Sequence, residues 1–201
     1  IYGCLVGSEM CIRDSHSIVG VRRRSGGSCF EVETAMIVDE FLDVVDESDN
    51  VVGRSRRSDV HQRGLLHRSI HLLVFNGLGE LLMQKRSMEK DEAPGKWCSS
   101  VAGHLDSGET YDDCVVREAK EEIGLELNSV PRKLFKIDAC EENGNEFTWT
   151  YQVTASGPFV FDFCEVTELQ WFNLKEVDRL IQEQEDIFSS SFLKVFRRLF
   201  Q

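Results

Sequence analysis

GHLDSGETYDDCVVREAKEEIGL, residues Gly103–Leu125, joins a glycine-containing loop to a run rich in acidic and apolar side chains. The segment fits the spacing G-x5-E-x7-R-E-U-x-E-E-x-G-U, where U is an apolar residue. The matching positions are Gly103, Glu109, Arg117, Glu118, Ala119, Glu121, Glu122, Gly124 and Leu125. Agreement at so many fixed positions indicates one defined site.

Residues 110–124 carry the signals of a single amphipathic helix. Thr110 followed by Asp113 is typical of a helix N-cap with an acidic residue in the first turn. Gly124 predicts the C-terminal end of the helix. Apolar side chains at i, i+3 and i+7 predict one buried face, formed by Val116, Ala119 and Ile123.

Glu118, Glu121 and Glu122 occupy i, i+3 and i+4 and therefore crowd a different face of this helix. Like charges at this spacing repel one another and weaken a helix, and we expect Arg117 and Lys120 to point elsewhere. A hard divalent cation would relieve the repulsion, because Mg²⁺ and Mn²⁺ prefer carboxylate oxygens. A solvated acidic face is the plain alternative. The rest of the motif at its fixed spacing favours the metal site.

The motif resembles the Nudix box, the metal-binding signature of enzymes that hydrolyse a nucleoside diphosphate linked to another group. The resemblance implies an α/β fold, a Nudix-type α/β/α sandwich with a mixed β-sheet. It also implies a hydrolase in which water attacks phosphorus in a pyrophosphate linkage, with metal and positioning supplying most of the rate. The implied cofactor is Mg²⁺, with Mn²⁺ as the alternative.

The resemblance also implies a role for each residue of the box. Three carboxylates and one backbone carbonyl are the implied metal ligands, namely Glu118, Glu121, Glu122 and Gly103. Glu118 and Glu122 are the implied catalytic carboxylates, and Glu118 is the expected base that takes a proton from water. Glu109 and Arg117 are expected to form a structural ion pair, and Gly124 to serve the backbone turn.

Three further groups outside the box are candidates for the site. Many Nudix enzymes take another acid from a downstream loop, for which Glu165 is the first candidate and Glu168 the second. Lys85 and Arg86 end a predicted strand and are candidate phosphate ligands, with a solvated strand end as the alternative. Trp97 is a candidate to stack on a base, although a tryptophan after Pro-Gly is more often a core anchor.

From Met36 onward the chain resembles a particular branch, the isopentenyl-diphosphate-isomerase-like Nudix proteins. The resemblance lies in Phe41–Val52, the strand at His67, Leu81–Ser87 and Pro94–Trp97. The isomerase uses a cysteine directly before a Gly-His pair, and here Ala102 precedes Gly103 and His104. An alanine cannot exchange a proton with an allylic carbon, so the sequence favours a hydrolase over the isomerase.

The same branch suggests a second group of ligands. The isomerase binds a divalent metal through histidines and glutamates, and His61, His67 and His104, with Glu146, are the residues here that resemble that site. Three histidines near a loop are weak evidence by themselves, and a metal role for them stays open.

Composition limits the class of protein. At 201 residues the chain is long enough for one domain and a little more. A net charge of −12 argues against nucleic acid or an anionic membrane as partner. The small-molecule diphosphate expected as substrate must therefore be met locally by metal and a few basic side chains. No apolar run reaches transmembrane length. Seven cysteines without a C-x-x-C pair predict free thiols in a reducing compartment, the cytoplasm.

The first residues are predicted to lie outside the functional domain. Leu5–Ser15, LVGSEMCIRDS, resembles the in-frame translation of a transposon adaptor used in DNA sequencing. We therefore expect residues 1–15 to be an artefact and residues 16–35 to be a non-native or disordered leader. The Nudix hydrolase domain is predicted to span residues 36–201, beginning at Met36.

Periodicity and turn signals predict the remaining elements. The expected strands are Phe41–Val45, Val51–Arg54, Ser69–Phe75, Glu80–Gln84, Cys98–Ala102, Lys133–Ala139, Phe147–Ala155 and Gln170–Phe172. The expected helices, besides that of the box, are a short one within Ser58–Leu66 and two at Leu174–Gln184 and Ser190–Phe200. Strands and helices mixed in this order suggest a sheet between helical layers.

Two questions stay open at this stage. Isoprenoid diphosphates, nucleotide sugars and oxidised nucleotides all remain possible substrates, and a catalytically idle Nudix binding module is a further class that the self-repelling carboxylates argue against. The apolar side of Phe192–Leu199 predicts domain core, with a homodimer contact as the alternative.

Overall fold

The computed structural model describes residues 40–201 of the chain. The predictions for residues 1–35, and for a natural start at Met36, lie outside this range. Within the described part, no helix combines the length and apolar character needed to cross a membrane.

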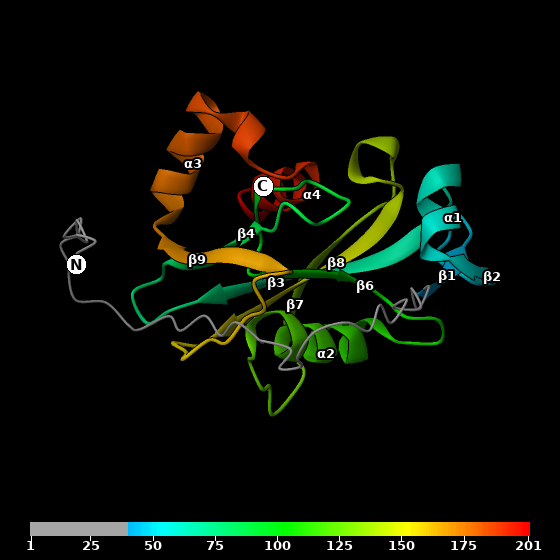
Figure 1. Cartoon of the computed structure of the whole chain (residues 1–201), viewed down its shortest axis with the longest axis horizontal. Coiled ribbons are helices and arrows are strands. Elements are labelled where there is room, and N and C mark those ends of the chain that lie inside the picture. Colours follow the sequence, from blue (N-terminus) through cyan, green and yellow to red (C-terminus); the bar gives the residue numbers. More distant parts are fainter. Residues whose placement is uncertain (1–39) are drawn as a thin grey trace, which may run out of the picture.

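Strands and helices are intermixed along the described chain (Figure 1). The strands are β1 (Phe41–Val45), β2 (Val51–Arg56), β3 (His67–Phe75), β4 (Leu81–Arg86), β5 (Trp97–Cys98), β6 (Val101–His104), β7 (Arg132–Ile137), β8 (Glu146–Thr154) and β9 (Val166–Phe172). The helices are α1 (Arg57–Arg63), α2 (Tyr111–Ile123), α3 (Leu174–Glu183) and α4 (Ser190–Leu199), with short 3-10 turns η1 (Glu141–Asn143) and η2 (Glu185–Ile187).

A mixed sheet forms the middle layer. Its centre is the parallel pair β3 and β8, which run side by side over their whole lengths. The neighbouring pairs, β7 with β8 and β4 with β9, are antiparallel. Helix α2 covers one face of this sheet, and α3 and α4 cover the other (Figure 1). The predicted α/β/α sandwich is confirmed.

The sheet splits beside β3. Strand β4 meets β3 only at the pair Phe75 and Leu81, and β6 takes over the same edge of β3 further along. The prediction of one continuous strand over Cys98–Ala102 is therefore wrong, because this segment forms two short strands, β5 and β6, that are interrupted at the split. There the Ser100 hydroxyl accepts from the Val74 amide at 2.8 Å and donates to the Leu82 carbonyl, replacing the missing ladder bonds.

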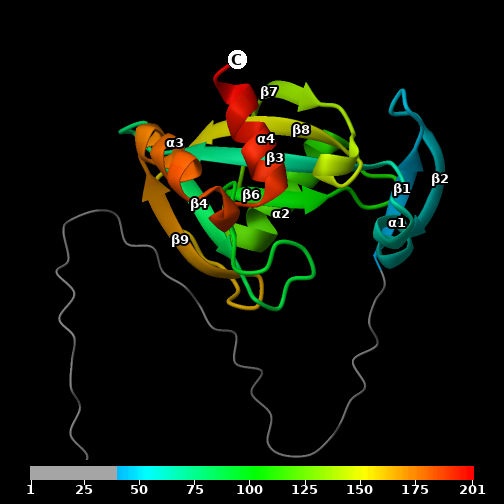
Figure 2. The ribbon, with the colours of Figure 1, turned by 90° about the horizontal axis from the view of Figure 1, so that it is seen from above.

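Two apolar cores hold the layers together. The core under α2 contains Val115, Ala119 and Ile123 packed against β3, and Val116 lies at its margin. The core under α3 and α4 includes Phe192 and Phe196. Figure 2 shows α4 lying across the sheet. The apolar side of this last helix is thus domain core, as the first of the two alternatives predicted.

Helix α2 begins and ends where its sequence predicts. The Thr110 side chain accepts a hydrogen bond from the Asp113 amide, which makes Thr110 the N-cap. Gly124 ends the helix in the left-handed region, at a φ of 65°. A Cβ at Gly124 would lie 2.8 Å from the Val160 carbonyl oxygen, so a larger residue would strain the turn and clash with the backbone.

The hairpin of β1 and β2 fixes the loop of the motif from outside the main sheet. The Ser107 amide donates to the Phe41 carbonyl at 2.8 Å. The Asp43 carboxylate accepts from the Ser107 hydroxyl at 2.7 Å and from the Gly108 amide at 3.0 Å. These hydrogen bonds fix the motif loop to the hairpin. The loop connects Gly103 with α2, so they also help to fix these two parts relative to each other.

Candidate functional site

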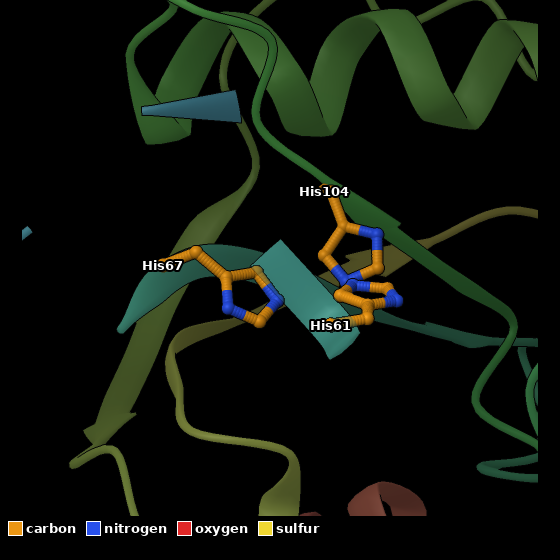
Figure 3. A group of neighbouring side chains, drawn as sticks. All are labelled: His61, His67 and His104. Atoms are coloured by element: carbon orange, nitrogen blue, oxygen red, sulfur yellow. The ribbon is translucent and has the colours of Figure 1, made fainter. Parts of the chain in front are cut away.

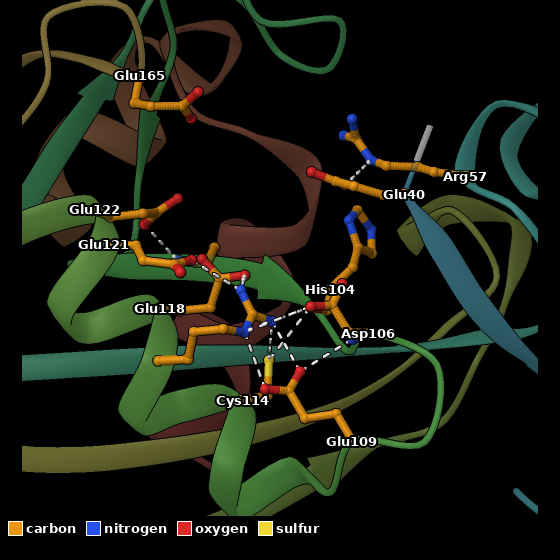
Figure 4. A network of polar contacts seen from close by, with 12 residues as sticks. Glu40, Arg57, His104, Asp106, Glu109, Cys114, Glu118, Glu121, Glu122 and Glu165 are labelled. Carbon is orange, nitrogen blue, oxygen red and sulfur yellow. Dashed lines mark hydrogen bonds and ion pairs between the residues drawn. The ribbon is translucent and has the colours of Figure 1, made fainter. Parts of the chain in front are cut away.

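The acidic face of α2 is divided between buried and exposed carboxylates. Glu122 is buried and the Glu118 side chain is largely buried, whereas Glu121 is exposed. Figure 4 shows these carboxylates projecting from α2 toward the region where Glu165 lies. Burying two acidic side chains side by side on a helix is costly without a compensating positive charge.

Glu122 reaches through the split in the sheet. Its Oε2 accepts a hydrogen bond from the Gln84 side-chain amide at 2.9 Å and another from the Ala102 backbone amide at 3.1 Å. Gln84 belongs to β4, which departs from β3 here, and Ala102 belongs to β6, which pairs with β3 beyond the split. The Glu122 carboxylate therefore bridges β4 and β6.

Glu118 lies directly against Gly103. A Cβ at Gly103 would come within 2.2 Å of the Glu118 carboxyl group. A glycine at this position is what allows the carboxylate to approach the backbone of β6. The Glu118 carboxylate and the backbone of Gly103 therefore lie side by side at the site.

Arg117 joins the carboxylates of α2 to the motif loop through several hydrogen bonds. Its guanidinium binds both oxygens of Glu109, at 2.9 and 2.8 Å, so the predicted structural ion pair is present. It also donates to Glu118 at 2.9 Å and to Glu121 at 3.0 Å. The expectation that Arg117 points away from the glutamates is therefore wrong. The long arginine side chain bends back over its own helix turn, whereas Lys120 pairs with Glu126.

The two buried glutamates hold their protons unusually strongly. Burial, and then the negative charge of Glu122, raises the pKa of Glu118 to about 8. Burial also raises the pKa of Glu122 to about 6, although the Ala102 amide acts in the opposite direction. The site favours the charged form of these carboxylates only when a cation is supplied.

These raised pKa values predict a pH-dependent response to magnesium. A carboxyl whose pKa is higher in the folded than in the unfolded protein stabilises the fold at pH below its ordinary value of 4.5, and this contribution is lost as the pH rises toward 8. A divalent cation bound to the ionised carboxylates would restore stability. We therefore expect the rise in Tm on adding Mg²⁺ to be larger at pH 8 than at pH 5, as measured by thermal unfolding with a chelator control. An equal rise at both pH values would contradict this explanation.

A second cluster forms where three elements converge. His61 comes from α1, His67 from the start of β3 and His104 from the end of β6, and their ring centroids lie 5.0 to 5.1 Å apart (Figure 3). The Glu146 carboxylate of β8 accepts a hydrogen bond from the His104 ring at 3.1 Å. Burial alone would raise the pKa of Glu146, but the contacts with His104 and His67 hold that pKa well below its usual range.

The hydrogen bonds of this second cluster leave ring nitrogens free to bind a cation. The Nδ1 atom of His67 lies 2.9 Å from the Leu65 carbonyl, and that of His61 lies 2.9 Å from the Glu92 carboxylate. Each Nδ1 therefore carries a proton, and in the neutral ring the opposite nitrogen, Nε2, presents a lone pair. In the protonated ring the Nε2 atom of His67 instead faces the Glu146 carboxylate at 3.7 Å. Both Nε2 atoms are buried and have no hydrogen-bond partner. This donor set fits a divalent metal.

One cavity of about 480 Å³ brings the two clusters together. The carboxylates of α2 and Glu165 border it, as do His104 and Glu146. Its lining also includes the four cations Arg57, Arg86, Lys90 and Arg117. A pocket lined by both carboxylates and cations suits an anionic ligand that is bound together with metal ions.

Of the two predicted phosphate ligands and the two predicted downstream acids, only one of each borders the cavity. Arg86 is buried, borders the cavity, and donates from Nε to the Glu92 carbonyl. Lys85, the next residue back along β4, points to the opposite face and lies over the Trp97 ring. Glu165 borders the cavity, whereas Glu168 is exposed on β9. Neither Lys85 nor Glu168 lines the cavity.

Trp97 takes the position of a core anchor. Its ring packs edge-on against Phe172 at 5.0 Å between centroids, within the core under α3 and α4. Trp97 does not border the cavity, so its surroundings favour packing over stacking on a base.

Three residues at the cavity escape sequence reasoning. Lys90 forms an ion pair with Glu165, and Glu92 pairs with His61, so the loop between β4 and β5 reaches both sides of the cavity. The hydrogen bond from His61 lowers the pKa of Glu92 to about 2. His71 is buried beside Ser99, and burial lowers the pKa of His71 to about 4. In the sequence, His71 is a single histidine within a predicted apolar strand, two residues after Ser69. That pattern is too weak to predict a residue of the site.

Comparison with known proteins agrees with this geometry. A family model described as the NUDIX domain matches residues 65–193, which is more than half of the chain. The chain belongs to the Nudix hydrolase family. Its members act on small molecules.

Two relatives and one solved structure are similar over most of their lengths. Isopentenyl-diphosphate Delta-isomerase 2 of Photorhabdus laumondii is 32% identical, over 81% of this chain and 93% of that protein. The prenyl-diphosphate phosphatase of Methanosarcina mazei is 30% identical, over 80% of this chain and 95% of that protein. The crystal structure of DR0079 from Deinococcus radiodurans has 27% identity and a TM-score of 0.73, covering 81% of this chain and all of that one. The chain thus lies near the isopentenyl-diphosphate-isomerase-like branch of its family.

Proposed function

We propose that this Nudix hydrolase cleaves the pyrophosphate linkage of an organic diphosphate with the help of Mg²⁺ or Mn²⁺. The observation that carries the proposal is the pair of buried carboxylates, Glu118 and Glu122, beside Gly103 at a cavity that also contains Arg86. Glu118, Glu121, Glu122 and the Gly103 carbonyl would hold the metal. When bound, the metal supplies positive charge against the phosphoryl oxygens and favours ionisation of water.

Other residues at the cavity would bind the substrate, transfer the proton and position the carboxylates. Arg86 neutralises and orients the diphosphate from the floor of the cavity, since a guanidinium suits phosphate oxygens. Glu118 would take the proton from the attacking water once a bound cation lowers its pKa, which burial raises to about 8 in the metal-free protein. Glu165 is a second acid at the mouth, oriented by its ion pair with Lys90. Arg117 keeps Glu109 and the α2 carboxylates in place.

A hydrolysis screen tests the proposal. The panel contains isopentenyl and longer prenyl diphosphates, a nucleotide sugar and an oxidised nucleotide, and phosphate or pyrophosphate release is followed with Mg²⁺ or Mn²⁺. Prenyl diphosphates are included because of the name of the Methanosarcina mazei relative. We expect turnover of at least one compound that a chelator abolishes. Absence of turnover across the panel would favour a binding module.

Isomerisation of isopentenyl diphosphate is the second candidate, supported by the name of the Photorhabdus relative and by the histidine cluster. Ala102 borders the cavity directly before Gly103, at the position that holds the isomerase cysteine by resemblance. A methyl group there offers no proton, so we expect no isomerisation. Proton NMR of isopentenyl diphosphate incubated with the protein distinguishes the two, and appearance of the isomer would overturn the assignment as a hydrolase.

We further propose that His61, His67, His104 and Glu146 hold a second divalent metal. His61→Ala removes one free Nε2 from the cluster without touching α2. We expect this variant to contain about one equivalent less divalent metal than the unsubstituted protein by elemental analysis, because loss of one ligand weakens such sites strongly. Glu126→Gln, which changes an exposed carboxylate outside both clusters, is the matched control and should retain the full metal content. Equal metal content in the His61→Ala variant would count against the second site.

The expected setting follows from the same chemistry. Bound metal and the cations at the cavity would meet a small anionic substrate despite the net negative charge of the chain. We place the protein in the cytoplasm, where the four described cysteines would remain free thiols. A homodimer stays open as a prediction.

A further inference from the structure

Lys194 and Cys140 form a side-chain pair outside the cavity. Lys194 lies on α4, and Cys140 directly precedes η1 in the segment between β7 and β8. The Nζ atom of Lys194 is 2.6 Å from the Sγ atom of Cys140. Figures 1 and 2 both show α4 beside this segment, so the contact joins parts of the chain that are 54 residues apart.

The separation of the two atoms is short for a hydrogen bond. Even N–H···O bonds, with the smaller oxygen acceptor, have typical lengths of about 2.9 Å. A nitrogen and a sulfur that are both bonded to one bridging oxygen lie close to the separation seen here. The geometry points to a redox modification site: we propose that Cys140 and Lys194 form a covalent N–O–S bridge when the protein meets hydrogen peroxide.

Access distinguishes this cysteine from the others that the structure describes. Cys98 and Cys114 are buried in the two cores, whereas Cys140 is partly exposed and the Lys194 side chain is 27% exposed. Cys164 is exposed but lies beside Asp162, whose negative charge raises the pKa of that thiol. Peroxide can therefore reach Cys140 while an amine stands next to its sulfur.

The chemistry balances with peroxide as the oxidant. The first peroxide converts the thiol to a sulfenic acid and releases water. In the second step the oxygen of the sulfenic acid becomes bonded to the lysine nitrogen, one N–H bond is lost, and a second peroxide is reduced to two waters. In total one thiol, one amine and two peroxides give one Cys–S–O–NH–Lys bridge and three waters. Sulfur and nitrogen each give up two electrons, which the two peroxide O–O bonds accept. Two equivalents of a dithiol reverse the reaction and release one water.

The bridge would act on the turn that presents Glu146. The Cys140 amide donates to the Asn143 side chain at 2.8 Å, and the Cys140 carbonyl accepts from the Asn145 amide at 2.8 Å. Asn143 in turn donates to the Glu146 carbonyl at 2.9 Å. Fixing Cys140 to α4 would therefore restrain the segment that leads to the histidine cluster, and closing this long loop covalently is expected to raise Tm.

Peptide mass spectrometry of the full chain tests the proposal. After peroxide treatment we expect one crosslinked peptide pair containing Cys140 and Lys194, with a gain of one oxygen and a loss of two hydrogens. Trypsin should no longer cut after Lys194, and a dithiol should restore both the cleavage and the original Tm. Circular dichroism before oxidation checks that each variant is folded.

Three variants complete the test. The crosslinked pair should be absent from Cys140→Ser and from Lys194→Arg, which keeps the positive charge but not the amine. It should persist in Cys164→Ser, the matched control for an exposed thiol. Failure to find the pair in the unsubstituted protein at peroxide levels that oxidise Cys164, or its persistence in Lys194→Arg, would overturn the proposal and leave an ordinary lysine–thiol contact.

Discussion

Replacing Glu122 with glutamine is expected to lower kcat at least about 100-fold against any diphosphate that the unsubstituted protein hydrolyses. Glu122 is buried between Gln84 and the Ala102 amide, both of which donate to its Oε2. A glutamine keeps the size of the side chain and one acceptor oxygen but removes the negative charge that a cation requires. Steady-state kinetics with saturating Mg²⁺ measure the effect, and circular dichroism checks the fold.

Glu126→Gln serves as the matched control for this substitution. Glu126 is an exposed acidic residue just beyond the end of α2 and forms an ion pair with Lys120. Exposed pairs of this kind contribute little, about 0 to 1 kcal/mol, so both kcat and Tm should remain close to their original values. Unchanged turnover in Glu122→Gln would remove Glu122 from the catalytic site.

Gly103→Ala is the second substitution with a large expected effect. The new Cβ would lie 2.2 Å from the Glu118 carboxyl group, so the flexible Glu118 side chain must move. Displacing a catalytic group by about 1 Å costs on the order of 100-fold in rate, and we expect kcat to fall by about that factor. The fold should survive, because the clash is with the end of a side chain and not with the backbone.

Gly53→Ala separates this effect from the general cost of replacing a strand glycine. Gly53 lies in β2, and a Cβ there would meet nothing within 4 Å. Its kcat should match that of the original protein. If Gly103→Ala and Gly53→Ala retained equal activity, the close approach of Glu118 to β6 would have no catalytic importance.

Local signals in the sequence predicted the parts of the fold that depend on neighbouring residues. The N-cap at Thr110 and the left-handed end at Gly124 follow from side-chain and backbone preferences within one helix, and both are confirmed. The break between β5 and β6 was not predictable in this way. It depends on how far β4 departs from β3, which is a property of the whole sheet.

In the candidate site, too, local spacing predicted some features and long-range packing determined the others. Spacing alone placed Glu118 and Glu122 on one helix face, and the structure adds that both are withdrawn from solvent. The path of the Arg117 side chain was predicted wrongly, because helical spacing fixes where a side chain starts and not where a long one ends. The contact of Lys90 with Glu165 joins residues 75 positions apart, and no local pattern indicates it.

The alternation of side chains along a strand limits which of the two candidate phosphate ligands can face the cavity. Lys85 and Arg86 are adjacent on β4, and neighbouring side chains on a strand point to opposite faces. Only one of the two could therefore face the cavity, and the structure identifies it as Arg86. Which face of β4 meets the cavity depends on the packing of β4 against β9 and could not be read from the sequence.

Direct titration of Mn²⁺ tests the central claim, that the carboxylates of α2 hold a divalent cation against a diphosphate. Calorimetry in the presence of a non-hydrolysable methylene diphosphonate should show saturable Mn²⁺ binding in the His61→Ala variant, where the histidine cluster lacks a ligand. Introducing Glu122→Gln into that variant should abolish the remaining binding. Identical isotherms for the two proteins, or no Mn²⁺ binding in either, would contradict the account.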